Sequence, residues 1–204
     1  ASYNNDTLED FAGMFRYSKL IEDINNADTS ILSNITTVRM YKYFTPTLNS
    51  GIKYTLSYNN ALYNPHSGHN SSGGGVISSS GFKVNNDSSL NEHFLDDDGA
   101  GNLRLYYLSG TTRVYTDTTY GTVNYTTGEV VLTSAHITSI SNVDGATSTQ
   151  VRVFATPSSN DVVPVRNQVL SIDTSNSTIT GEVDGIESGS SQAGTTYTTT
   201  SSYS

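Results

Sequence analysis

The spacing of apolar residues in the first part of the chain predicts one amphipathic helix. Residues 7–26 read TLEDFAGMFRYSKLIEDINN, with apolar side chains recurring every three or four positions. Thr7 followed by Asp10 forms a capping-box pattern at the start, and two asparagines mark the end. The apolar face packs either on the chain's own sheet or on another chain. The aromatic residues Phe11, Phe15 and Tyr17 favour the second interpretation, because aromatic side chains are enriched at protein interfaces.

From residue 34 onward the apolar residues alternate with polar ones, which predicts half-buried strands. Turn residues separate these runs, and a Thr-Gly turn joins the two halves of 122–132 into a hairpin. The predicted fold is therefore α+β, mainly β, built of antiparallel strands and hairpins with one N-terminal amphipathic helix. The strands are expected at 35–44, 51–58, 76–77, 82–84, 94–95, 103–108, 122–132 and 149–155.

Three regions follow from these patterns. Residues 1–33 form an N-terminal helical segment, 34–174 a β-rich domain and 175–204 a polar tail. The tail is rich in Ser, Thr and Gly and has no apolar period, so burial cannot offset the entropy of ordering it. Residues 64–75, NPHSGHNSSGGG, are expected to form a long loop.

Composition narrows the possible partners. The 204 residues carry a net charge of −9, which disfavours nucleic acid and anionic membranes. There is no cysteine, and no apolar run approaches the length of a membrane span. Only 14% of the residues are charged, and 14 tyrosines supply much of the apolar bulk, a balance typical of half-exposed β structure.

The histidines and aspartates give only weak indications of a metal or catalytic site. His66 and His69 are three residues apart in the glycine-rich loop, but no third metal ligand has a motif spacing. Asp96-Asp97-Asp98-Gly99 begins like a calcium loop, yet Tyr107 occupies the twelfth position, where a glutamate is required. We interpret the run as a turn between two strands. With no hydrolase motif present, we expect no enzyme, no catalytic residue, no metal and no cofactor.

Four segments together resemble a known family. They are LEDFAGMFRYSKLIEDINNADTSILSNITTVRM, FLDDDGAGNLRLYY, YGTVNYTTGEVVL and NDVVPVRNQVLSID. In order and spacing they are similar to the C-terminal region of the large ring-forming baseplate wedge subunit of T-even-like contractile-tailed bacteriophages. The Tyr- and Asn-rich composition resembles versions from phages of marine cyanobacteria. The resemblance covers most of residues 7–174, but neither the 67–75 insert nor the 185–204 tail.

The resemblance implies a structural role in the virion. Subunits of this family pair within each wedge and join neighbouring wedges into a ring around the tail hub. The ring holds the sheath extended and rearranges when the fibres bind a host. The implied partners are copies of the chain and other baseplate wedge proteins, with no nucleic acid, membrane or small-molecule substrate. The implied location is the tail baseplate, assembled in the host cytoplasm.

The run NDVVPVRNQVLSID, residues 160–173, interrupts its valines with Pro164 and Arg166. Proline is tolerated on an edge strand, so we expect an edge strand at 161–172. Arg166 could pair with a carboxylate across a contact, or could simply be solvated. Combined with the helix, this segment gives the candidate interface residues: Phe11, Phe15, Arg16, Tyr17, Asp161, Val163 and Arg166.

Two other functions remain open. A host-binding tail-fibre or adhesin domain would use clustered tyrosines in a concave patch to recognise surface glycans. A β-rich hydrolase would need two convergent carboxylates or a metal in a cleft.

Overall fold

The computed structural model describes residues 8, 13–70, 75–143, 145–164 and 169–182. The chain divides into two compact units, residues 1–171 and 172–204. The second unit contains the short 3-10 helix Thr174–Asn176. The elements of the first unit are α1 (Tyr17–Asn25), β1 (Met40–Phe44), β2 (Gly51–Ser57), β3 (Ile77–Ser79), β4 (Phe82–Val84), β5 (His93–Asp97), β6 (Asn102–Ser109), β7 (Thr112–Asn124), β8 (Glu129–Ile140) and β9 (Val151–Ala155).

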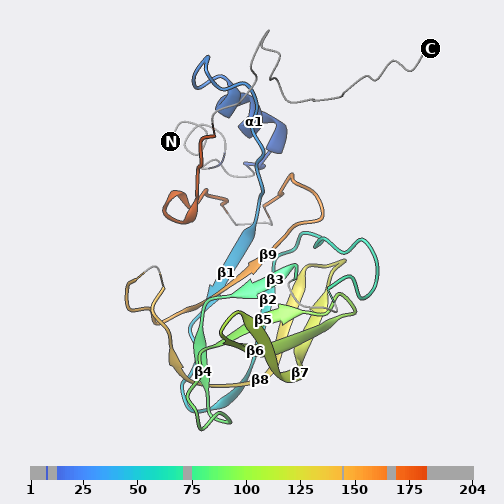
Figure 1. Ribbon diagram of the computed structural model, residues 1–204. Coiled ribbons are helices and arrows are strands. Elements are labelled where there is room, and N and C mark those ends of the chain that lie inside the picture. The colour runs from blue at the N-terminus through green and yellow to red at the C-terminus, as the bar shows by residue number, and fades with distance from the viewer. Residues whose placement is uncertain (1–7, 9–12, 71–74, 144, 165–168, 183–204) are drawn as a thin grey trace, which may run out of the picture. The chain divides into compact units, whose positions relative to one another are not determined.

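Five antiparallel strands close into a barrel. The pairing order runs β4-β5-β6-β7-β8, and β8 pairs back with β4 through its C-terminal half. Strand β8 is long enough to pair with three strands (Figure 1): its first half pairs with β7 on one edge and with β2 on the other, and its last residues pair with β4. Closure removes most open edges of this sheet.

A second, three-stranded sheet has the order β1-β9-β3. Strand β9 reads VRVFA, and its three small apolar residues Val151, Val153 and Ala155 are fully buried. They join one apolar core with residues of the barrel strands. The hydroxyl of Tyr58, which follows β2, donates to the Val153 carbonyl at 2.6 Å and so links this sheet to the core.

The mainly β, antiparallel fold class with one helix is confirmed. The predicted hairpin at 122–132 is the β7–β8 connection, and the predicted strand at 149–155 contains β9. The first strand is shorter than expected, since β1 begins at Met40 rather than at residue 35.

The prediction of one continuous helix over 7–26 was wrong at residues 13–16, which are not helical, so that α1 begins at Tyr17. Thr7 lies outside the described residues. Phe15 is in a β-bridge, with its N–H donating to the Val162 carbonyl at 2.9 Å and its carbonyl accepting from Val162 at 3.0 Å. Because the backbone groups of Phe15 are used by a remote segment, they are not available to a helix.

The edge-strand prediction for 161–172 was also wrong for the residues that are described. Val162 makes its single bridge to Phe15, and 163–164 and 169–172 have no strand assignment. Pro164 lacks an amide proton, which prevents a continuing ladder at that position. Residues 165–168, including Arg166, lie outside the described residues.

We predict that the turn after β7 depends on Gly128. Its φ is +69°, and a Cβ at this position would overlap the backbone carbonyl oxygen of Asn60. Gly110 has a similar φ of +64° with open space around it, so it reports the conformational cost alone. Gly110→Ala should cost about 1 kcal/mol of unfolding free energy, and Gly128→Ala about 1–3 kcal/mol more, because the backbone must shift. Urea unfolding measures both, and equal costs would contradict this account of the turn.

Candidate functional site

The predicted helix and the predicted edge segment meet each other in the structure. Phe15 and Val162, 7% and 5% exposed, pair through their backbones. Next to this bridge, the Oδ1 of Asp161 accepts the backbone N–H of Tyr17 at 2.8 Å. Arg16, the residue before the helix, is extended and makes no side-chain cap. Asp161 therefore supplies the missing N-terminal cap from 144 residues away in sequence, and its charge suits the positive end of the helix.

Further bonds tie this junction to its surroundings. The Tyr17 hydroxyl donates to the Thr36 carbonyl at 3.0 Å, and Asn34 donates to the Asn25 side chain at 2.6 Å. On the other side, Asn60 bonds both the carbonyl and the N–H of Val163, at 3.1 and 3.2 Å. Residues 161–163 thus connect α1 to the loop that follows β2.

The apolar face of α1 is incompletely covered. No residue of the helix is fully buried, and Leu20, Ile21 and Ile24 remain half-buried. Just after the helix, Leu32 is 73% exposed and Ile35 is 100% exposed. Single exposed apolar side chains are common, whereas several within one short segment make that segment a candidate contact surface. We call Leu20, Ile21, Ile24, Leu32 and Ile35 the helical apolar surface.

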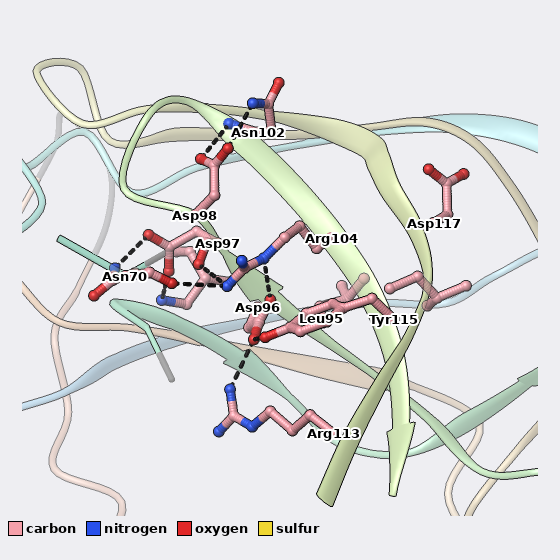
Figure 2. A network of polar contacts seen from close by, with 12 residues as sticks. Asn70, Leu95, Asp96, Asp97, Asp98, Asn102, Arg104, Arg113, Tyr115 and Asp117 are labelled. Carbon is pink, nitrogen blue, oxygen red and sulfur yellow. Dashed lines mark hydrogen bonds and ion pairs between the residues drawn. The ribbon is translucent and has the colours of Figure 1, made fainter. Parts of the chain in front are cut away.

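A second polar cluster lies on strands β5, β6 and β7 of the barrel and is centred on Asp96 (Figure 2). Asp96 is 1% exposed and accepts from Arg104 Nε at 2.9 Å, Arg113 Nη1 at 2.7 Å and the Tyr115 hydroxyl at 2.8 Å. Burial, followed by the bond to Asp96, raises the pKa of Tyr115. The Arg104 guanidinium also lies over the Tyr115 ring, 4.4 Å from its centroid.

The carboxylate of the neighbouring Asp97 is also surrounded by hydrogen-bond donors. It is fully buried, and its oxygens accept from Asn70 at 2.7 Å, from the Ile77 N–H at 2.8 Å and from the Tyr125 hydroxyl at 2.7 Å. Arg104 closes the network by donating to the carbonyls of Asn70 and Asp97. Burial, followed by the bond to Asp97, raises the pKa of Tyr125 above its usual range. These donors hold Asn70, the start of β3 and Tyr125 against β5.

Of the three consecutive aspartates, only Asp98 lies in the turn that the sequence predicts. Asp98 accepts from the N–H groups of Ala100 and Asn102 and from the Asn102 side chain. Burial opposes the ionisation of Asp98, but these bonds outweigh it and lower its pKa. Asp96 and Asp97 instead belong to β5, so placing the whole run 96–102 in the turn was wrong. The carboxylates of Asp96, Asp97 and Asp98 are engaged by protein donors.

The described histidine side chains are not grouped as metal ligands. The rings of His66 and His69 stack edge to face, 5.7 Å apart. Within the described ranges, no group of three or more His, Asp or Glu residues could hold a metal ion. His93 is fully buried, contacts the Asn91 carbonyl through Nδ1, and lines a cavity of about 180 Å³ beside Tyr120. A polar cavity of this size suits bound water.

The structure brings together four of the predicted site residues. Phe15, Arg16, Tyr17 and Asp161 lie at the junction, and Val163 follows it with 51% exposure. Phe11 and Arg166 lie outside the described residues. The predicted set did not include Leu32 and Ile35, although Ile31, Leu32 and Ile35 stand out in the sequence as apolar residues in a polar stretch.

Comparison with known proteins gives one family match. Residues 1–43 match the family described as baseplate structural protein gp6, C-terminal domain III. The match agrees with the resemblance to a baseplate wedge subunit, and it spans α1 and most of β1. It supports a structural role in a phage baseplate, a virion location and contacts with other baseplate proteins. No curated protein matches the chain. In the described part of the chain, no helix is long and apolar enough to cross a membrane.

We predict that the charge on Asp96 stabilises the barrel. Asp96→Asn keeps the shape but leaves two guanidinium groups without their carboxylate. The unfolding free energy should fall by about 3–5 kcal/mol, the usual cost of breaking a buried pair. Asp98→Asn is the matched control, because the asparagine oxygen can still accept the two backbone bonds of the turn and only the bond from the Asn102 side chain is lost. It should cost about 1 kcal/mol or less. Calorimetry or urea unfolding that gives equal losses would contradict the role of Asp96.

Stability should decline in alkali because buried tyrosines must stay protonated. Burial raises the pKa of Tyr120 to about 12 and that of Tyr58 well above its usual range. A tyrosine in the unfolded chain ionises near about pH 10, so the stabilisation is complete below that pH and is lost as the pH rises toward the folded values. Urea unfolding across this window should show the decline, with a smaller slope in Tyr120→Phe. An unchanged slope in that variant would contradict the assignment.

Proposed function

We propose that this chain is a structural subunit of the baseplate wedge in a contractile-tailed phage. In this proposal it forms ring contacts that hold the baseplate and then switch it for sheath contraction. The observation that carries the proposal is the match of residues 1–43 to a baseplate family. The matched segment contains α1, the helical apolar surface and the start of β1.

The exposure of the matched segment supports a contact role. An apolar side chain gains about 1.5–3 kcal/mol when it is fully buried, so Leu32 and Ile35 would stabilise a complex that covered them. Val163 lies beside the helix junction and extends the same kind of surface. We propose that the predicted site residues act here, with the helical apolar surface as the larger part of the contact.

The proposed partners are copies of this chain and other wedge proteins. Pairing within a wedge and joining between wedges require two different surfaces on each subunit. The helical apolar surface is the candidate for one of them. Assembly in the host cytoplasm belongs to the same proposal, since a virion component is made there before the particle is complete.

Switching needs an element with two arrangements of similar free energy. The junction of α1 suits this need, because it depends on a bridge at Phe15, the cap by Asp161 and the Tyr17–Thr36 bond. Hydrogen bonds of this kind contribute about 0.5–1.5 kcal/mol each. A partner that covers the helical apolar surface could therefore exchange these bonds for new ones.

Host-glycan recognition receives less support. Tyr41, Tyr43 and Tyr63 are exposed, but none of them lines the cavities beside Tyr125 and His93. The concave aromatic patch that an adhesin needs is therefore not found at these positions.

Aspartate substitutions on exposed apolar residues test the proposal. Ile35→Asp and Val163→Asp should leave the melting temperature within about 2 °C of the wild type, because neither side chain is buried. Each should reduce co-purification with the wedge proteins encoded beside it by about tenfold or more, since a charge would be buried at the contact. Light scattering of the mixed, purified proteins measures the complex.

The matched control is Leu108→Asp. Leu108 is 48% exposed at the end of β6, comparable to Val163, but it belongs to neither the matched segment nor the junction. It should assemble like the wild type. If all three variants assemble normally, or if the wild-type chain ignores the wedge proteins, the proposed function is wrong.

A further inference from the structure

All five strands of the barrel border one polar cavity of about 180 Å³, beside the loop that joins β4 to β5. Ligand sites recur at the ends of β-barrels, where several strands can each contribute a side chain. The cavity is separate from the Asp96 network, and Asp117, which lines the cavity, lies apart from that network in Figure 2. The strands β4 to β8 contribute, in this order, Val84, His93, Leu105, Tyr120 and His136.

The strand pairing is irregular where it borders this cavity. Between Asp117 and Gly121, β7 has more residues than the stretch of β6 that it pairs with. The pairing of β4 with β8 shifts as well, just before Val84. Bulges of this kind redirect side chains and are over-represented at barrel rims and beside active sites. The irregular part of β7 is the part that brings Asp117 and Tyr120 to the cavity.

His93 gives the cavity a buried acceptor. The side chain is fully buried, and its Nδ1 lies 3.0 Å from the Asn91 carbonyl oxygen. Because a carbonyl oxygen can only accept, Nδ1 carries the proton, and Nε2 of the neutral ring is an acceptor. Among the described residues, Nε2 has no hydrogen-bond partner, and Asp87 Oδ2, itself an acceptor, lies 4.0 Å away. A donor bound in the cavity would recover the free energy that this unpaired acceptor costs.

Carboxylates border the same space. Asp87 and Asp117 line the cavity, whereas no lysine or arginine is among its described lining residues. Within the described ranges Asp117 forms no ion pair, and Asp87 has only the 4.0 Å contact with His93. Burial opposes the ionisation of Asp87, but bonds from Asn91 and Ser89 outweigh it and lower its pKa. The cavity therefore favours a cation.

Tyr120 and the apolar wall complete the cavity. The buried hydroxyl of Tyr120 makes no hydrogen bond of normal geometry in the described part of the chain. Burial and then the charge of Asp117 raise the pKa of Tyr120 to about 12, although the His136 backbone acts in the opposite direction. The hydroxyl thus stays protonated, and its oxygen can accept from a cation. Val84 and Leu105, 6% and 4% exposed, supply apolar contacts for an alkyl chain.

We propose that this cavity binds a guanidinium group carried on a short alkyl chain. The N–H groups of the guanidinium donate to His93 Nε2, to the Tyr120 hydroxyl oxygen and to the two carboxylates. A metal ion fits less well, because the described residues contain no group of three or more His, Asp or Glu that could hold one. An ammonium also fits less well, since it has three donors instead of five and is more strongly hydrated. This inference goes beyond the proposed function and does not depend on it.

Titration of the full chain with butylguanidinium tests the inference. The chain has four histidines, so NMR of histidine-labelled protein reports on the cavity and on a control region together. The signals of His93 and His136 should shift, whereas those of His66 and His69, which do not line the cavity, should not. Butylurea has the same shape without the charge and should bind about tenfold more weakly or less.

A second probe identifies the source of the guanidinium group. Nα-acetyl-arginine N-methylamide represents an arginine side chain within a protein, and butylguanidinium represents a small free molecule. Equal affinities would support the cavity as a site for an arginine side chain of another protein. Binding of butylguanidinium alone would support it as a site for a free molecule.

Substitutions then locate the site. Asp117→Asn and Tyr120→Phe should each weaken the binding of butylguanidinium about tenfold, the effect of one lost charge-assisted hydrogen bond. An asparagine oxygen at 117 can still accept the Thr119 N–H, so the local turn is kept. Glu129→Gln is the matched control, because it removes the same charge at an exposed position of β8 outside the cavity, and it should bind like the wild type.

Three results would overturn the inference. They are equal binding of butylurea and butylguanidinium, unchanged affinity in both folded variants, and His93 signals that respond to no probe, which would leave bound water as the only occupant. Circular dichroism establishes that the variants are folded. Because no baseplate protein takes part, this test can fail while the proposed function stands, and the reverse also holds.

Discussion

The buried charge of Asp96 is the constraint on which the β structure depends. An ionised carboxylate in the core is tolerated only when donors surround it, and here Arg104, Arg113 and Tyr115 provide them. These donors come from β6 and β7, so the register of β5, β6 and β7 must be correct before the charge is compensated. Asp97 extends the same requirement to the loop before β3 through Asn70 and Ile77. The network therefore favours one register of these strands. A purely apolar core would discriminate less strongly between alternative registers.

Helix α1 is less completely packed than the barrel. The barrel is closed and the carboxylates of Asp96 and Asp97 are hydrogen-bonded, whereas α1 has no fully buried residue and receives its cap from Asp161. The segment that contains α1 thus exposes apolar side chains, such as Leu32 and Ile35. This division suits a subunit that must keep its own fold while its contacts change.

The sequence predicted the fold class well and the junction poorly, for physical reasons. Alternation over 149–155 and 122–132 is local, so strands and hairpin could be read from it. The start of α1 could not be predicted in this way. The backbone N–H and carbonyl of Phe15 are hydrogen-bonded to Val162, 147 positions away, and no local sequence pattern contains that pairing. Likewise Asp96 and Asp97 look like turn residues until the cations of β6 and β7 are placed beside them. Of the candidate residues, Phe15, Tyr17 and Asp161 proved to be neighbours, which the two segments' separate patterns did not show.

Cryo-electron microscopy of the intact contractile tail tests the central claim most directly. The account predicts that the chain lies in the baseplate ring, with residues 15–35 and 161–163 covered by another protein chain. A map that places the chain outside the baseplate, or that leaves Leu32, Ile35 and Val163 facing solvent in both the extended and the contracted tail, would contradict it.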